Sequence, residues 1–265
     1  MAEVAVATLN LFNREGRWPV RAPLVVRQFL ELAPDVAGLQ EVDHVIDQAN
    51  WLVGWINAEL GRPEYTAYHM FNPRGVAGPE SLAIVSRLPV LEHDGLDYLA
   101  MEDVAHRVRL DLGGGGRLDL YNTHLYYRQT AAGGRVRRGE ARRLVEWADA
   151  HVGDAPRVLV GDFNAPAGGG TVAIFKEAHR SAYEAVHGRE PRQTWPTPLA
   201  FTVDAMRCYG VAVVPAAYHA VFDYIFVSRA IEVLDARLAF DRSDPADDTL
   251  YPSDHFGLVA RLRVG

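Results

Sequence analysis

The sequence has a single cysteine, Cys208, among its 265 residues. One cysteine excludes a disulfide framework and a thiolate zinc cluster, because each of these needs several cysteines. No apolar run approaches the roughly 20 residues that a helix needs to cross a bilayer. The first residues enter a strand pattern directly, without the basic leader or apolar core of a secretion signal. We therefore expect a soluble, cytoplasmic protein.

The sequence also lacks a surplus of positive charge. It has 27 Lys and Arg against 34 Asp and Glu, which gives a formal net charge of −7. A general nucleic-acid binder uses an excess of basic residues to displace counterions from phosphates. The charge balance therefore weighs against a large polyanionic substrate, although it leaves room for a local basic cleft.

What is present is typical of an ordinary globular α/β protein. Hydrophobic residues make up 49% of the chain and charged residues 23%. We find no linker-like stretch and no repeat, so we expect a single domain over residues 1–265. Strand patterns are predicted at 4–9, 36–42, 65–71, 81–86, 157–161, 222–228, 233–240 and 256–262, and helices at 24–32, 46–60 and 138–150.

Two alternating runs, residues 108–112 and 117–121, surround four glycines and predict a β-hairpin. A hairpin forces an antiparallel strand pair, which a purely parallel βαβ fold does not contain. Hairpins and helical crossovers together favour two packed mixed β-sheets flanked by helices.

Polar side chains recur where the predicted strands end, which is where α/β proteins place their sites. Carboxylates and amides without thiolates offer the oxygen ligands that Mg²⁺ or Mn²⁺ prefers, whereas zinc prefers His and Cys. The histidines among them can exchange a proton near neutral pH. The set consists of Asn10, Glu41, His124, Asp162, Asn164, Asp223, Asp254 and His255.

Each of these residues taken alone also has a structural explanation. Asn10 could form a turn, and the Asp162-x-Asn164 pair could cap a helix. His124 could be a core histidine whose hydrogen bonds are satisfied inside the protein. The ordered recurrence of six such motifs along one chain is much harder to explain in this way.

The ordered motifs resemble those of the endonuclease/exonuclease/phosphatase superfamily. The resemblance runs from Val4 to Leu262 and implies that family's deoxyribonuclease-like, four-layer α/β sandwich. It also implies a phosphate-ester hydrolase that depends on a divalent metal, Mg²⁺ or Mn²⁺. The motifs are Thr8-Leu9-Asn10, Leu39-Gln40-Glu41-Val42, Asn122-Thr123-His124-Leu125, Gly161-Asp162-Phe163-Asn164, Asp223-Tyr224-Ile225 and Ser253-Asp254-His255.

The resemblance assigns metal and phosphate roles by position. Glu41 resembles the principal metal ligand, and Asn10 beside it resembles the residue that contacts metal-bound water or phosphate. Asp254 resembles a second carboxylate on the metal side. Asp162 resembles the residue that orients or deprotonates the attacking water, and Asn164 the amide that holds the phosphate.

The same resemblance implies two catalytic histidines. His255 resembles the histidine that contacts the scissile phosphate, with Asp223 fixing its tautomer. His124 resembles the second histidine of the deoxyribonuclease and sphingomyelinase branches. Whether Asp162 or the His255–Asp223 pair is the general base stays open. Such a set suits phosphate-ester cleavage, because the transition state gathers negative charge that a cation and hydrogen-bond donors stabilise.

Three further residues have weaker expectations. Arg107 precedes the Asn-Thr-His-Leu motif by one strand, where many members have an arginine that reaches the phosphate. Trp18 and Trp195 each precede a proline, in loops that would border the cleft, and for Trp195 we expect a substrate contact.

The substrate is left open between classes. The net charge and His124 favour a small molecule or a lipid headgroup, held through a phosphodiester or phosphomonoester. The alternative is a DNA or RNA nuclease, which predicts a positive cleft lined by Arg107, Arg128 and Arg137. A non-catalytic binding module on the same fold is less favoured, because such relatives usually lack one of the metal or His/Asp residues. The sequence does not predict an oligomeric state.

Overall fold

The computed structural model describes residues 1–71, 80–99, 103–151, 155–199 and 220–265. Cys208 therefore lies outside the described residues. The strands are β1 (Ala2–Asn10), β2 (Val36–Asp43), β3 (Thr66–Met70), β4 (Glu80–Ser86), β5 (Val90–Asp97), β6 (Val104–Gly113), β7 (Gly116–His124), β8 (Arg157–Asp162), β9 (His179–Ser181), β10 (Asp223–Ser228), β11 (Glu232–Ala239) and β12 (Gly257–Val264). The helices are α1 (Trp18–Leu32), α2 (Gln48–Leu60), α3 (Ala131–Ala150), α4 (Gly170–Ala178) and α5 (Ala182–His187).

The strands form two mixed sheets of six strands each. The first has the order β11-β12-β1-β2-β4-β3, and the second has the order β5-β6-β7-β8-β10-β9. Each sheet contains one parallel pair, β1 with β2 and β7 with β8, among antiparallel neighbours. The expected pair of mixed sheets is therefore confirmed.

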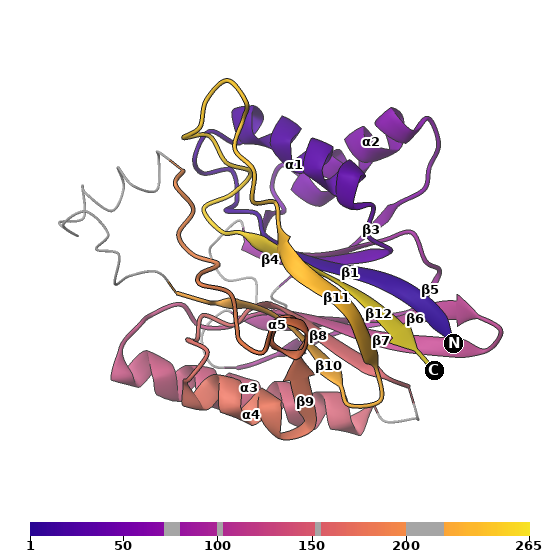
Figure 1. Cartoon of the computed structure of the whole chain (residues 1–265), viewed down its shortest axis with the longest axis vertical. Helices are drawn as coiled ribbons and strands as arrows, with labels where there is room; N and C mark the ends of the chain where they lie inside the picture. Colours follow the sequence, from indigo (N-terminus) through magenta and orange to yellow (C-terminus); the bar gives the residue numbers. More distant parts are fainter. Residues whose placement is uncertain (72–79, 100–102, 152–154, 200–219) are drawn as a thin grey trace.

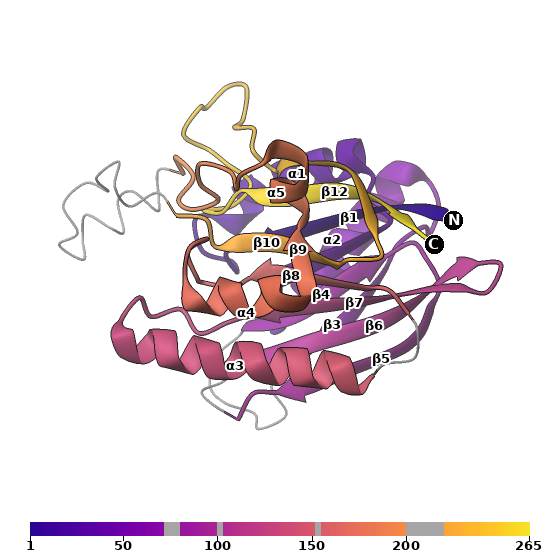
Figure 2. The ribbon, with the colours of Figure 1, turned by 60° about the horizontal axis from the view of Figure 1, so that its bottom comes forward.

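The sheets stack face to face and helices cover their outer faces, so the molecule has four layers (Figure 1). Helices α1 and α2 lie over the first sheet, and α3 and α4 lie along the second, as Figure 2 shows from another side. Apolar side chains fill the space between each pair of layers. Val6, Val108 and Val160 belong to the core between the sheets. Phe29 belongs to the core under α1 and α2, and Phe175 to the core under α3 and α4.

The predicted hairpin is confirmed. Val108 of β6 lies opposite Leu120 of β7, and the chain turns between Gly113 and Gly116. The structure adds β5, α4, β9 and α5, which the sequence pattern did not predict. Helix α3 begins at Ala131, earlier than expected, with the Thr130 side chain accepting a hydrogen bond from the Gly133 N–H as an N-cap.

Helix α1 also begins earlier than expected. Pro19 lies in its first turn, where backbone N–H groups have no acceptor within the helix, so that the lack of an N–H in proline removes no helical hydrogen bond. Trp18 is therefore the first residue of this helix and is 5% exposed, so the expectation of a loop at the cleft was wrong for Trp18. Among the described residues, no helix combines the length and apolarity needed to cross a membrane.

Candidate active site

The ends of the central strands bring polar residues from both sheets together. Asn10 ends β1, and Glu41 lies in β2, the parallel neighbour of β1. His124 ends β7 and lies opposite Asp162, the last residue of β8. The two sheets meet here through side chains, because Asn10 Nδ2 donates to Glu41 Oε1 at 2.9 Å and to Asp162 Oδ2 at 3.2 Å.

Asp162 lies at the centre of this group. Besides accepting from Asn10, its Oδ2 lies 3.5 Å from His124 Nε2 and 3.7 Å from His255 Nε2. Its Oδ1 accepts the backbone N–H of Asn164 at 2.8 Å. Asp162 is 1% exposed, so its carboxylate is held by these donors rather than by bulk water.

His255 joins the group from the segment before β12. Its Nδ1 lies 2.9 Å from Oδ2 of Asp223, which begins β10. The neighbouring Asp254 accepts the indole N–H of Trp195 at 3.2 Å. The Trp195 ring lies 6.5 Å from the His255 ring, which places Trp195 beside this group of residues.

Burial and mutual charge shift the titration of these groups. Burial is the main reason that the pKa of Glu41 rises to about 7, although His124 opposes the rise. Burial likewise raises the pKa of Asp223 to about 6 against the charge of His255. Burial alone would lower the pKa of His255, but the charges of Asp223, Asp254 and Asp162 outweigh it and raise that pKa well above its ordinary value. The pKa of His124 rises in the same way, through Asp162 and Glu41.

Two site residues have left-handed backbone conformations. Glu41 has φ +49° and Asn164 has φ +47°. Asparagine adopts this conformation readily, but for glutamate it costs free energy, which is commonly seen at functional sites. The Asn164 side chain donates to the backbone oxygen of Leu125 at 2.9 Å, so this amide also ties the Asp162 loop to the residue after His124.

Two sets of side chains have donor atoms close enough to hold a metal ion. One consists of Glu41, Glu80 and His124, and the other of Asp162, Asp223 and His255; within each set the donor atoms lie within 4.8 Å of one another. Asp254, expected on the metal side, belongs to neither set. Carboxylate oxygens with one imidazole fit a divalent cation, so the residues present suit the metal that the fold family implies.

Glu80 is the residue that the motifs missed. It opens β4 opposite Asp43 of β2, and this antiparallel pairing brings it beside Glu41. Its only signal in the sequence was its place before the apolar strand 81–86, and many strands begin with an exposed carboxylate.

The structure does not bring Arg107 to this site. Its guanidinium is 1% exposed and lies 3.3 Å from carboxylate oxygens of Glu92, Asp94 and Asp119. Three carboxylates thus surround a side chain that faces away from solvent, and the expectation that it reaches a phosphate is not met. Arg137 is also buried, and it donates to the backbone oxygens of Tyr126 and Arg128 at 2.8 Å.

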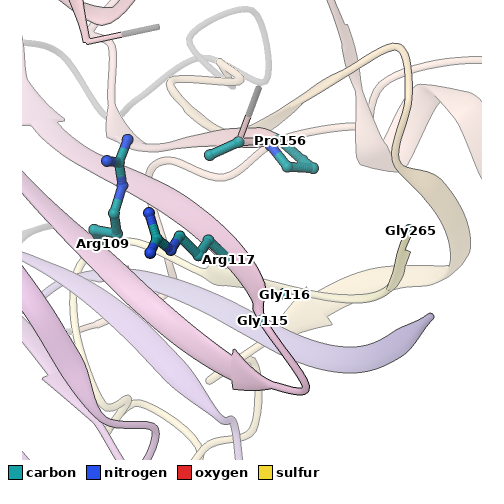
Figure 3. A pocket seen from close by; sticks show the side chains of 7 residues that line it. Arg109, Gly115, Gly116, Arg117, Pro156 and Gly265 are labelled. Atoms are coloured by element: carbon teal, nitrogen blue, oxygen red, sulfur yellow. The ribbon is translucent and has the colours of Figure 1, made fainter. Parts of the chain in front are cut away.

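A pocket of the described surface lies at the opposite end of β7, away from the site. Figure 3 shows Arg109 and Arg117 beside the β6–β7 turn, near Pro156. None of the predicted site residues lines this pocket. One of its two arginines already has a carboxylate partner, because Arg109 donates to both oxygens of Asp119 at 2.8 Å.

The chain is similar in sequence and in fold to known proteins. A model of the Endonuclease/Exonuclease/phosphatase family matches residues 7–255. Nocturnin of Drosophila melanogaster is 30% identical over 163 residues, which are 56% of this chain and 24% of that protein. The chain therefore spans about a quarter of that relative's length.

Solved structures share the fold at low identity. The human Nocturnin catalytic domain with a bound sulfate anion superposes with a TM-score of 0.74 at 22% identity, over 100% of this chain and 94% of that one. An endonuclease/exonuclease/phosphatase from Bacteroides vulgatus gives 0.75 at 21%, over 100% of both chains. TDP2 of D. rerio, in complex with a single strand DNA product, gives 0.75 at 17%, also over 100% of both.

The family match covers most of the chain, and the four-layer fold of these neighbours is the fold observed here. This chain belongs to the endonuclease/exonuclease/phosphatase family, whose members are hydrolases that act on phosphate esters.

Proposed function

We propose that this protein hydrolyses a phosphate ester with the help of Mg²⁺ or Mn²⁺. The observation that carries the proposal is the position of Asp162, whose Oδ2 lies within 3.7 Å of polar nitrogens of Asn10, His124 and His255. Next to it, Glu41 offers a carboxylate for a cation. Family membership supports the reaction class, and these contacts support the roles of the individual residues.

Glu41 is the principal residue proposed to hold the metal, with Glu80, whose donor oxygen lies within 4.8 Å of that of Glu41, as a second ligand. Asn10 positions the Glu41 carboxylate through the 2.9 Å hydrogen bond, and Asp254, the chain neighbour of His255, contributes negative charge to the same group of residues. When bound, a divalent cation would neutralise part of the charge that develops on the phosphate oxygens.

The protein residues have distinct tasks in this proposal. Asp162 orients the attacking water and accepts its proton. His255, kept protonated by Asp223, donates hydrogen bonds to the phosphate as negative charge accumulates. His124, also with a raised pKa, faces the same space from β7 and supplies a second cationic donor. Asn164 holds the Asp162 loop and lies beside the phosphate position.

For the substrate we favour a small molecule or a lipid headgroup over a polynucleotide. A nuclease cleft was expected to use Arg107, Arg128 and Arg137. Two of these arginines, Arg107 and Arg137, are buried and bonded inside the protein, and only Arg128 is exposed. Together with the net charge of −7, the burial of these two arginines weighs against the basic cleft that a long polyanion needs. Trp195 is the proposed substrate contact at the rim.

The proposal is tested with purified protein and a panel of phosphate esters. The panel comprises bis-p-nitrophenyl phosphate, p-nitrophenyl phosphate, phospholipid headgroups, inositol phosphates and short oligonucleotides, each with Mg²⁺, Mn²⁺ or EDTA. We expect metal-dependent release from a small ester, abolished by EDTA and by His255→Ala. Absence of release from every ester with either metal would refute the proposal, and preference for oligonucleotides with a steep salt dependence would replace its substrate class.

A further inference from the structure

Arg21 lies in the first turn of α1 and has no exposed surface. Its guanidinium donates to six backbone carbonyls. Five of these belong to the segment between β1 and α1, with donor–acceptor distances from 2.7 to 3.3 Å, and the sixth belongs to a residue just before β12. The acceptors are the carbonyls of Leu11, Phe12, Asn13, Glu15, Gly16 and Pro252.

The segments that Arg21 joins carry site residues. The first follows Asn10 directly, and the Phe12 N–H donates to Asn10 Oδ1 at 2.9 Å. The Asn13 N–H donates to the backbone oxygen of Glu41 at 3.0 Å. On the other side, Pro252 precedes Ser253, whose hydroxyl donates to the backbone oxygen of Asn10 at 2.6 Å. Arg21 thus connects the backbone around Asn10 with the backbone that leads to Asp254 and His255.

The charge of Arg21 has no direct carboxylate partner among the described residues. Burial lowers its pKa to about 10, against the more distant charges of Asp254, Glu41 and Glu15. A buried cation without an ion pair is costly, and the first turn of a helix disfavours positive charge further. The surrounding carbonyls and the Phe12 and Trp18 rings, 5.5 and 5.4 Å from the guanidinium carbon, offset that cost.

The space around the guanidinium is shaped to fit it. Gly16 has φ +55°, and a Cβ at this position would lie 3.3 Å from Arg21 Nε and 3.1 Å from the Phe12 ring. Arginine alone offers five N–H donors in a fixed plane. A lysine could keep the charge but has three donors, and therefore leaves several of the carbonyls without a partner.

We infer that Arg21 is a positioning residue of the candidate active site: it holds Asn10 and the Ser253–His255 segment in register across the first sheet. The inference rests on the proposed phosphate-ester hydrolysis, because the residues that Arg21 positions are those proposed to carry out that reaction. Arg21 itself does not touch the reacting atoms, because it is fully buried behind the loop.

The test compares Arg21→Lys and Arg21→Met with the wild type. Mn²⁺ binding is measured by calorimetry, and kcat and KM with whichever panel ester is cleaved. We expect Arg21→Met to weaken Mn²⁺ binding at least tenfold and to lower kcat at least a hundredfold, with KM within threefold of the wild type. Arg21→Lys should fold and show intermediate losses, because it keeps the charge and part of the bonding.

Arg109→Lys and Arg109→Met are the matched controls, because Arg109 is also a largely buried arginine and lies in β6, beside the pocket at the β6–β7 turn and away from the site. They should lower the melting temperature without changing Mn²⁺ binding or kcat. If Arg21→Met does not fold, Arg21→Lys decides. Wild-type Mn²⁺ affinity and kcat in the folded Arg21 variants would overturn the inference. A wild-type protein that binds Mn²⁺ but cleaves nothing would refute the proposed function, and the Mn²⁺ affinities would still decide the role of Arg21.

Discussion

Oδ2 of Asp223 lies 2.9 Å from Nδ1 of His255, and both side chains are buried. This contact leaves Nε2 as the ring nitrogen that faces Asp162. It also makes the imidazolium the stable form of His255, because the carboxylates around it raise its pKa well above the ordinary value. The pair can therefore present a donor, rather than an acceptor, to a phosphate at neutral pH.

Replacing Asp223 with Asn should remove the preference of His255 for its protonated form. The pKa of His255 should fall, so the activity that depends on its protonated form should be lost at a lower pH than in the wild type. We expect the basic limb of the pH–rate profile to move down by at least one pH unit and kcat at pH 8 to fall about a hundredfold, or about 2.7 kcal/mol. A kinetic profile from pH 5 to 9 measures both.

The matched control for that variant is Asp235→Asn, at an exposed position of β11. Its profile should superimpose on that of the wild type. In Asp223→Asn, by contrast, stability should fall together with activity. The raised pKa of His255 stabilises the folded wild-type protein below pH 6.5, and this contribution is lost as the pH rises through the folded-state pKa. Movement of the acidic limb alone in Asp223→Asn would contradict the role given to His255.

Glu80→Gln should weaken metal binding without unfolding the protein. Glu80 is exposed, and its carboxylate oxygen lies within 4.8 Å of the donor atoms of Glu41 and His124. Loss of one charged ligand should raise the Kd for Mn²⁺ about tenfold, or about 1.4 kcal/mol, and Glu41→Gln should raise it further. Calorimetric titration measures both values.

Glu92→Gln, on exposed β5, serves as the control for a change of surface charge. Its Kd for Mn²⁺ should match the wild type. Equal Kd values for the wild type and Glu80→Gln would exclude Glu80 from the metal site while leaving Glu41 in place.

His106 should make the protein sensitive to acid. Its side chain has no exposed surface, and neither ring nitrogen has a hydrogen-bond partner in the described part of the chain. Burial, with smaller contributions from His93 and His69, lowers its pKa to about 3. The unfolded state therefore binds the proton first, and stability is lost as the pH falls below 6.5. At pH 4 this loss is on the order of 3 kcal/mol.

His106→Leu isolates this effect. At pH 7 the substitution removes no hydrogen bond of the His106 ring within the described part of the chain, so we expect a stability change of about 1 kcal/mol or less. From pH 7 to pH 4, the difference between variant and wild type should move by about 3 kcal/mol in favour of the variant. Urea denaturation at several pH values measures it, and parallel curves for the two proteins would contradict the prediction.

The sequence predicted the central part of the fold and the edge that carries the site. Apolar runs predict β1 and β2, alternating runs predict the β6–β7 hairpin, and motif residues lie in or at the ends of β1, β2 and β7. Local patterns suffice there, because strand direction alone decides which ends meet. Glu80 could not be found in this way, since its place depends on the pairing of β2 with β4, two segments separated along the chain.

The mistaken expectation for Arg107 has a similar cause. Strand β5 is mostly exposed and polar, so it has no apolar period by which to recognise it. Because β5 was not predicted, the sequence did not indicate that Glu92 and Asp94 accept hydrogen bonds from the Arg107 guanidinium.

Helix α3 was predicted too short because of glycines in its first turns, which oppose helix formation. The Thr130 cap and the hydrogen bonds of Arg137 compensate for them.

Arg107→Met should therefore lower stability without affecting substrate binding. The change leaves Asp119, which is 2% exposed, with Arg109 as its remaining partner, and it removes the cation between Glu92 and Asp94. Breaking a buried ion pair from one side typically costs about 3 kcal/mol or more. Chemical denaturation should show a loss of this order, while KM for a cleaved phosphate ester stays within twofold of the wild type. A tenfold rise in KM with unchanged stability would contradict this prediction and indicate that Arg107 contacts the phosphate. Only a side chain that touches the substrate could change KM without changing the free energy of unfolding.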